Sequence, residues 1–137
     1  MNFLLGTDVL SELRRRTPDP GVLAWFASVD SAQLYLSVLT IGEIRQGICR
    51  LQRRDARQAS VSDQWLAGLL RAYSDRIVPV TAEIAQEWGS LNVPDALPVV
   101  DGLLAATAKV HGWTLVTRNA SDVANTGAPL YDPFTYR

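Results

Sequence analysis

A chain of 137 residues, 47% of them apolar, is close to the commonest length of one folded domain, so we expect a single domain over residues 1–137. The single cysteine excludes an internal disulfide, the N-terminus lacks a secretory signal pattern, and no apolar run is long enough to cross a bilayer. We therefore expect a cytoplasmic protein with no membrane partner, and the net charge of −1 argues against a general nucleic-acid binder.

The first half of the chain alternates short apolar runs with helical patterns. Residues 3–5 predict a buried strand, and Asp19-Pro20 predicts a helix start with Asp as N-cap and Pro as the first helical residue. Residues 34–38 predict the second strand. Thr40 and Glu43 then have the spacing of a capping box, which predicts a helix from there to about residue 53.

The second half continues the same alternation. Helical periodicity predicts a helix over residues 55–73, and residues 77–80 predict a third strand whose proline favours a sheet edge. Thr81 can cap the next helix, and residues 97–111 predict a further helix that stops at Gly112. Residues 114–117 predict the fourth strand, and residues 129–131 predict a fifth at the edge.

Strands that alternate with helices favour crossover connections and hence a parallel sheet covered on both faces. The fold class we expect is α/β: a three-layer α/β/α domain with a mainly parallel sheet of four or five strands. In such sheets, ligands bind outside the carboxyl ends of the strands.

Acidic and polar side chains follow these strands or begin the helices after them. They are Asp8, Glu43, Asp101, Thr117, Asn119 and Asp122. Carboxylates brought together at one edge repel each other, so a cation normally lies between them. Oxygen ligands without a His or Cys cluster suit Mg²⁺ or Mn²⁺ rather than Zn²⁺. The residues alone therefore predict a divalent-metal site of this kind.

Four segments resemble the signature blocks of VapC-type PIN domains. They read NFLLGTDVLSEL (residues 2–13), LSVLTIGEIRQG (36–47), DGLLAATA (101–108) and LVTRN (115–119), and the chain closes with DPF (132–134). The blocks occur in the family's order over essentially the whole chain. The resemblance implies a Mg²⁺- or Mn²⁺-dependent endoribonuclease toxin that is usually a homodimer. It also implies that a cognate VapB-like antitoxin holds the toxin inactive in a higher assembly, and that RNA is the substrate.

The resemblance assigns site residues position by position. Glu43, Asp101 and Asp122 fall on the second, third and fourth acidic positions, as metal-binding and catalytic residues, with Thr117 and Asn119 on the assisting polar positions. The first position departs from the pattern. The family has Asp followed by Thr-Asn, whereas this chain reads Gly6-Thr7-Asp8.

The glycine at position 6 has three readings. It is an inactivating change that was selected or introduced, or the mark of a naturally decayed site, or it is compensated by Asp8 as a substitute metal ligand. Against the last reading, Asp8 is expected to lie already in the helix, although residues two apart on a strand point the same way. The sequence predicts weak metal affinity and little or no activity.

Each site residue also has a purely structural reading. Glu43 could serve the capping box, Asp8 and Asp101 could be first-turn helix acids, Asp122 could cap a short turn, and Thr117 and Asn119 could shape a turn.

Ten of the thirteen basic residues lie at or before Arg76, and twelve are arginines. Arg50 to Arg57 could be the solvated face of a helix, or part of a basic rim that grips RNA phosphates. Arg14, Arg15 and Arg45 are the candidate RNA contacts.

Two rival functions remain open. One is a binding-only pseudo-nuclease that dimerises and captures antitoxin without cleaving RNA, which Gly6 favours. The other is a phosphate-accepting receiver domain, which needs a lysine at its site. The only lysine, Lys109, is expected two turns down a helix.

Overall fold

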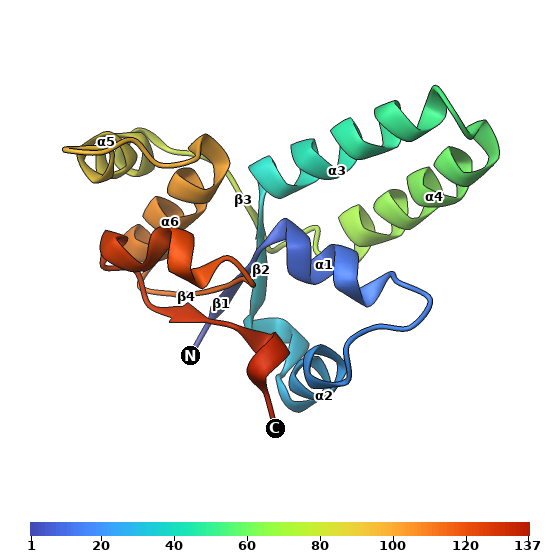
Figure 1. The fold of residues 1–137 in the computed structure, drawn as a ribbon, viewed down its shortest axis with the longest axis horizontal. Coiled ribbons are helices and arrows are strands. Elements are labelled where there is room, and N and C mark those ends of the chain that lie inside the picture. Colours follow the sequence, from blue (N-terminus) through green and yellow to red (C-terminus); the bar gives the residue numbers. More distant parts are fainter.

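A five-stranded parallel sheet runs through the middle of the molecule, and helices cover both of its faces (Figure 1). The computed structural model describes residues 1–137. The strands are β1 (Phe3–Leu5), β2 (Leu34–Ser37), β3 (Ile77–Val78), β4 (Thr114–Val116) and β5 (Leu130–Tyr131), in the spatial order β3-β2-β1-β4-β5. Every neighbouring pair is parallel, which confirms the predicted three-layer α/β/α architecture and the edge position of β3.

Six α-helices and three short 3-10 segments connect the strands. The helices are α1 (Thr7–Leu13), α2 (Pro20–Ser28), α3 (Val38–Gln52), α4 (Ala56–Ala72), α5 (Ala82–Leu91) and α6 (Val99–His111). The 3-10 segments are η1 (Ser31–Gln33), η2 (Ala120–Thr126) and η3 (Pro133–Thr135). In Figure 1, α3 and α4 form an antiparallel pair that projects from the sheet, and α5 and α6 lie on its other side. No helix combines the length and apolar character needed to cross a lipid bilayer.

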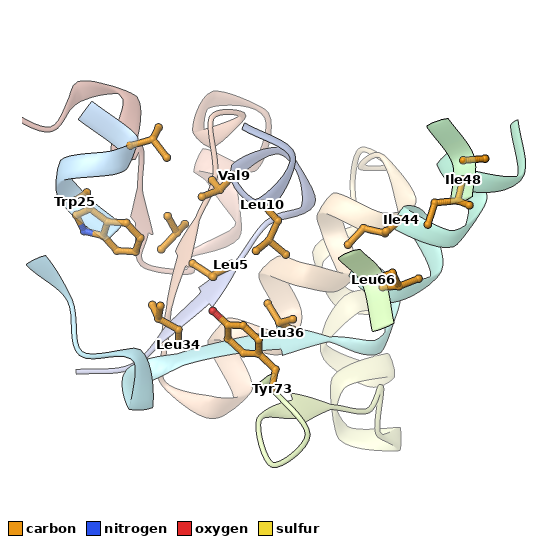
Figure 2. Close-up of a cluster of buried hydrophobic side chains, with 13 residues drawn as sticks. Leu5, Val9, Leu10, Trp25, Leu34, Leu36, Ile44, Ile48, Leu66 and Tyr73 are labelled. Carbon is orange, nitrogen blue, oxygen red and sulfur yellow. The ribbon is translucent and has the colours of Figure 1, made fainter. Parts of the chain in front are cut away.

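Alternate residues of the central strands enter two separate cores, because successive side chains of a strand point to opposite faces. Leu5 packs with α1, α2, α3 and α4 in the larger cluster, shown in Figure 2, whereas Leu4 packs with α6 and β4 in the smaller one. On β4, Val116 joins the first cluster and Leu115 the second. The sheet is therefore buried on both faces, and its functional surface is left to the strand ends.

Helix starts agree with the predicted caps at two places and disagree at a third. The side chains of Asp19 and Thr81 accept backbone hydrogen bonds at the starts of α2 and α5, as predicted. The predicted capping box at Thr40 is wrong. Helix α3 begins two residues earlier, at Val38, because Ser37 at the end of β2 accepts a hydrogen bond from the amide of Leu39 and so acts as N-cap. Thr40 is fully buried inside the helix instead.

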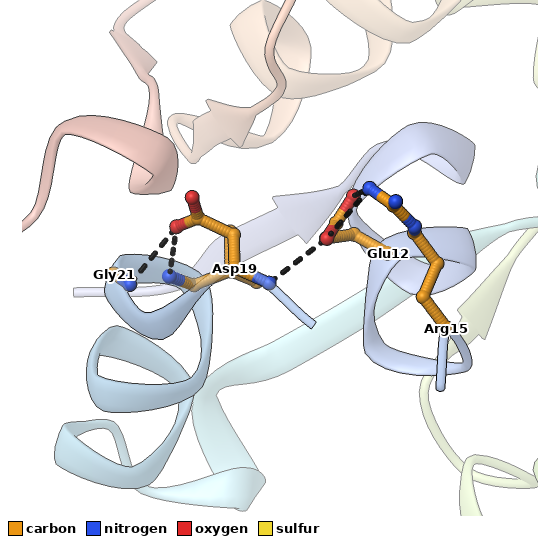
Figure 3. Close-up of polar contacts among 5 residues, drawn as sticks. Glu12, Arg15, Asp19 and Gly21 are labelled. Carbon is orange, nitrogen blue, oxygen red and sulfur yellow. Dashed lines mark hydrogen bonds and ion pairs between the residues drawn. The ribbon is translucent and has the colours of Figure 1, made fainter. Parts of the chain in front are cut away.

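The turn between α1 and α2 is fixed by a buried carboxylate. Glu12 is only 5% exposed, and it accepts hydrogen bonds from the amide of Asp19 at 2.9 Å and from Arg15 (Figure 3). Asp19 in turn accepts hydrogen bonds from the amides of Gly21 and Val22. The carboxylate of Glu12 thus links the end of α1 to the start of α2.

Two glycines provide a test of helix energetics. Gly112 ends α6 with φ 70° and ψ 30°, a left-handed conformation that costs other residues roughly 1–2 kcal/mol, so Gly112→Ala is expected to destabilise the protein by about that amount. Gly68 lies inside α4, where an added Cβ meets only the tip of Arg71 at 3.9 Å, so Gly68→Ala is expected to stabilise by about 0.5–1 kcal/mol. Urea denaturation measures both, and shifts of the same sign would contradict this account.

Candidate functional site

Strands β1, β2 and β4 end side by side, and the residues that follow them surround a small pocket. The amide of Gly6 donates to the carbonyl of Val116 at 2.8 Å, which joins the ends of β1 and β4. The pocket has a volume of about 170 Å³ and is lined by Gly6, Thr7, Asp8, Glu43, Asp101, Leu104, Thr117 and Asn119. Five of the six site residues expected from the sequence therefore line one pocket at the predicted edge.

Glu43 reaches this pocket from the second turn of α3. Its Oε1 accepts a hydrogen bond from the hydroxyl of Thr7, the residue directly after Gly6. The alternative role in a capping box is wrong, since α3 starts upstream of Thr40. Thr7 was not assigned a role from the sequence, although it lies in the first of the four blocks.

Asp101 lies in the first turn of α6 and lines the same pocket as Glu43. Burial raises the pKa of the Asp101 carboxyl above its ordinary value, and the negative charges of Glu43, Asp122 and Asp8 raise it further. The other three acids predicted for the site therefore lie close enough to Asp101 to repel its negative charge. A cation at this place would relieve that repulsion.

Asp122 is placed differently from the other acids. It is exposed on η2 and does not line the pocket, yet its charge reaches Asp101. The reading of Asp122 as a helix cap is wrong, since it lies within η2 and Asn119 occupies the N-cap position. Asp122 is thus a peripheral acid of the site.

Thr117 and Asn119 shape the turn after β4 and line the pocket as well. The hydroxyl of Thr117 accepts a hydrogen bond from the amide of Asn119 at 3.0 Å and donates one to Asp8 Oδ2 at 3.2 Å. Thr117 is buried, whereas Asn119 is exposed. Their structural reading holds, and it leaves both side chains at the pocket.

Asp8 turns back from the first turn of α1 toward the end of β4. Its Oδ2 also accepts a hydrogen bond from the amide of Arg118 at 2.8 Å, and its Oδ1 accepts one from the amide of Val9 at 2.9 Å. A Cβ on Gly6 would stand 2.7 Å from Asp8 Oδ1 and 3.0 Å from the carbonyl oxygen of Val116. The carboxylate of Asp8 thus lies beside the place that a side chain at position 6 would enter.

The donor set is compatible with a hard divalent cation. All the candidate ligands are carboxylate, hydroxyl or amide oxygens, which suit Mg²⁺ and Mn²⁺. No three acidic side chains are close enough to hold an ion by themselves. Mg²⁺ usually binds through one or two carboxylates and keeps several waters, so Glu43 and Asp101 fit that requirement.

The three candidate RNA-binding arginines make intramolecular contacts, and their role with RNA stays a prediction. Arg14 donates to Ser62 and stacks on Trp65 at 4.5 Å, in a groove of about 220 Å³ that Glu43 also lines. Arg15 pairs with Glu12, and Arg45 with Asp63 at 2.7 Å. Arg14 is the one of the three whose groove adjoins the acidic pocket.

The lysine that a phosphate-accepting receiver domain needs does not lie at the acidic pocket. Lys109 pairs with Glu87 of α5 at 2.7 Å and does not line the acidic pocket. The acidic pocket therefore has no lysine to neutralise an accepted phosphate.

The pattern of the PIN-domain family matches residues 3–126. The chain belongs to the PIN-domain family. This confirms, at the level of the family, the resemblance of the four sequence blocks.

Similar proteins cover this PIN domain almost end to end. A protein of Sinorhizobium fredii named VapC ribonuclease Y4jK is 29% identical, over 96% of this chain and 97% of its own length. Toxin FitB of Neisseria gonorrhoeae is 27% identical over 96% of this chain and 98% of its own length. The crystal structure of FitAcB from Neisseria gonorrhoeae contains a chain with a TM-score of 0.90 and 28% identity, covering 97% of this chain and 99% of that one. These relatives support membership of a nuclease and toxin family.

Proposed function

We propose that this PIN domain is a divalent-metal-dependent endoribonuclease, the toxin of a toxin–antitoxin pair, with activity weakened by Gly6. The observation that carries the proposal is the convergence of Glu43 and Asp101, from α3 and α6, on one pocket at the carboxyl edge of the sheet. A relative named as a VapC ribonuclease and another named as a toxin, each similar over nearly the whole chain, support it.

Each residue has a distinct part in this proposal. Glu43 and Asp101 hold Mg²⁺ or Mn²⁺, and Asp122 adds negative charge from the rim of the site. Thr117 and Asn119 order the turn after β4, from which the Thr117 hydroxyl holds the carboxylate of Asp8, and they orient water at the pocket. The bound metal supplies the chemistry, by activating water and neutralising charge on the scissile phosphodiester.

Gly6 weakens the site because it has no side chain that could bind the metal at the end of the central strand. It follows β1 directly, between the ends of β2 and β4, where a carboxylate would be held rigidly by the sheet. The resemblance places the first acid of the family at this position. The loss of that ligand lowers metal affinity, and cleavage is therefore slow.

The partners follow from the proposed activity. A cytoplasmic ribonuclease toxin needs restraint inside the cell that makes it, so the proposed partners are a VapB-like antitoxin, a second copy of the chain and RNA. A single cysteine suits this reducing compartment. Arg14, in the groove next to Glu43, is the arginine best placed to meet an RNA phosphate.

Incubating total RNA with the protein tests the proposed activity. We expect slow endonucleolytic cleavage with Mn²⁺ or Mg²⁺ and none with EDTA, because the carboxylates repel the phosphodiester unless a cation lies between them. Cleavage that persists in EDTA would point to a contaminating or metal-independent nuclease. The absence of any cleavage, together with capture of the antitoxin, would support a second candidate.

That second candidate is a pseudo-nuclease that binds antitoxin but does not cleave RNA. It is favoured by the missing side chain at Gly6 and by the absence of any three acids close enough to hold an ion. The two candidates differ in one readout, since both capture antitoxin and only the nuclease cuts RNA when metal is added.

A further inference from the structure

The carboxylate of Asp8 lies in the acidic pocket, as the reading of Asp8 as a substitute metal ligand requires. Asp8 lies in the first turn of α1, as expected, and its side chain lines the same pocket as Glu43 and Asp101. Three donors hold it there, from Val9, Thr117 and Arg118. Residues just after β4 and at the start of α1 thus fix this carboxylate at the edge of the sheet.

The position of Oδ1 relative to Gly6 is the informative distance. In an aspartate, each carboxylate oxygen stands roughly 2.4 Å from its own Cβ, as ordinary C–C and C–O bond lengths require. Asp8 Oδ1 lies 2.7 Å from the point where a Cβ on Gly6 would be. An oxygen of Asp8 therefore stands about as far from that point as an aspartate at position 6 would place its own.

The hydrogen bonds leave Asp8 Oδ1 with a lone pair that can bind a cation. A carboxylate has about four lone-pair sites, two on each oxygen. Oδ2 accepts from Thr117 and Arg118, which uses both of its sites, whereas Oδ1 accepts only from Val9. The atom with a free lone pair is the one beside Gly6.

Glycine at position 6 is what makes room for this arrangement. Its φ of −71° and ψ of 156° are open to any residue, so the backbone does not require glycine there. An added Cβ would crowd Asp8 Oδ1, so the Asp8 carboxylate would have to move from its present position. The missing side chain and the inward turn of Asp8 are thus two halves of one arrangement.

We propose that Asp8 supplies the carboxylate that position 6 lacks and binds the divalent cation through Oδ1 in the pocket that Glu43 and Asp101 also line. Because the three acids are not close enough to hold an ion by themselves, water completes the coordination. This inference rests on the proposed metal-dependent function and names the ligand that sustains it. Because its other donors hold Asp8 in a structural role, binding is weaker than in a site with a carboxylate on the strand itself.

Titration with Mn²⁺ alone, followed by calorimetry and by electron paramagnetic resonance of free Mn²⁺, tests the inference without relying on activity. Asp8→Asn is expected to weaken Mn²⁺ binding about tenfold or more, since even indirect partners of a metal are worth 10–100-fold in affinity. Asp75→Asn is the matched control, because Asp75 is 80% exposed and lies before the start of β3, whereas the pocket lies at the carboxyl ends of the strands. The Mn²⁺ affinity of this variant should equal that of the starting chain.

Two further variants test the geometry itself. Gly6→Ala removes no metal ligand but puts a Cβ against Asp8 Oδ1, so it should displace this oxygen and weaken Mn²⁺ binding. Gly6→Asp/Asp8→Asn returns a carboxylate to the end of the strand and removes the neighbouring negative charge, as in the Asp-Thr-Asn pattern of the family, so it should bind Mn²⁺ more tightly than the starting chain. Circular dichroism and melting in EDTA confirm that each variant is folded.

The outcomes separate the inference from the function on which it rests. Equal Mn²⁺ affinity in the starting chain and in Asp8→Asn overturns the inference. If Glu43→Gln nevertheless binds Mn²⁺ more weakly, the proposed metal site still stands without Asp8. Binding by Gly6→Asp/Asp8→Asn but not by the starting chain also overturns it, with the site again intact. If no variant binds Mn²⁺, the inference and the proposed function fail together.

Discussion

Asp101→Asn is expected to slow metal-dependent RNA cleavage by about 100-fold or more, because the several kcal/mol that a metal contributes to the transition state correspond to at least two factors of ten. Asp101 lines the acidic pocket, and the pKa of its carboxyl is raised by burial and then by the other three acids. Asparagine keeps the shape but gives up the charge. Single-turnover cleavage of a defined RNA with saturating Mn²⁺ measures the effect, in the starting chain and in Gly6→Asp/Asp8→Asn.

The stability of this variant provides its control. Burial, and then Glu43, Asp122 and Asp8, raise the pKa of Asp101, so the folded chain binds this proton more tightly than the unfolded chain. The stability contributed by the protonated group is present at acid pH and is lost as pH rises through the folded-state pKa. Asp101→Asn should therefore melt at a slightly higher temperature than the starting chain at neutral pH in EDTA, with the difference shrinking toward acid pH.

A fall in cleavage together with a lower melting temperature at neutral pH would mean that Asp101 stabilises the fold, and would remove the case for it as a metal ligand. Asp75→Asn, far from the site, should leave both cleavage and melting temperature unchanged. The pair separates the loss of a ligand from the loss of a surface charge.

Leu34→Ala is expected to reduce the free energy of unfolding by about 2–5 kcal/mol, the usual cost of emptying a fully buried leucine site. Leu34 is completely buried at the start of β2, in the larger core and at the opposite end of the strand from the acidic pocket (Figure 2). A loss of this size is a large part of the stability of a small domain. Urea denaturation followed by circular dichroism measures it.

Leu23→Ala is the matched control, since Leu23 is 45% exposed on α2. This change should stay within roughly 0.5 kcal/mol of the starting chain, as exposed positions usually do. Equal losses at the two positions would show that α2 packs against something on its outer face. The comparison tests whether burial in the larger core determines the loss of stability.

Local signals in the sequence were sufficient for most of the secondary structure. Apolar runs located the strands, and Asp19 and Thr81 marked helix starts that the structure confirms with hydrogen bonds. The start of α3 was misplaced, because Ser37, at the end of a strand, was a competing N-cap that the spacing of Thr40 and Glu43 concealed. Local patterns cannot rank two possible caps when burial of Thr40 decides between them.

The sequence by itself determined the fold class and placed Glu43, Asp101 and Thr117 at the correct edge, because parallel strands bring the residues that follow them to one side of the sheet. Only the tertiary structure decided where Asp8 points. Its side chain bonds to Thr117 and Arg118, more than a hundred residues away, and its Oδ1 lies 2.7 Å from the place that a Cβ at position 6 would take. A side-chain direction fixed by distant donors and by an absent Cβ leaves no periodic trace in the chain.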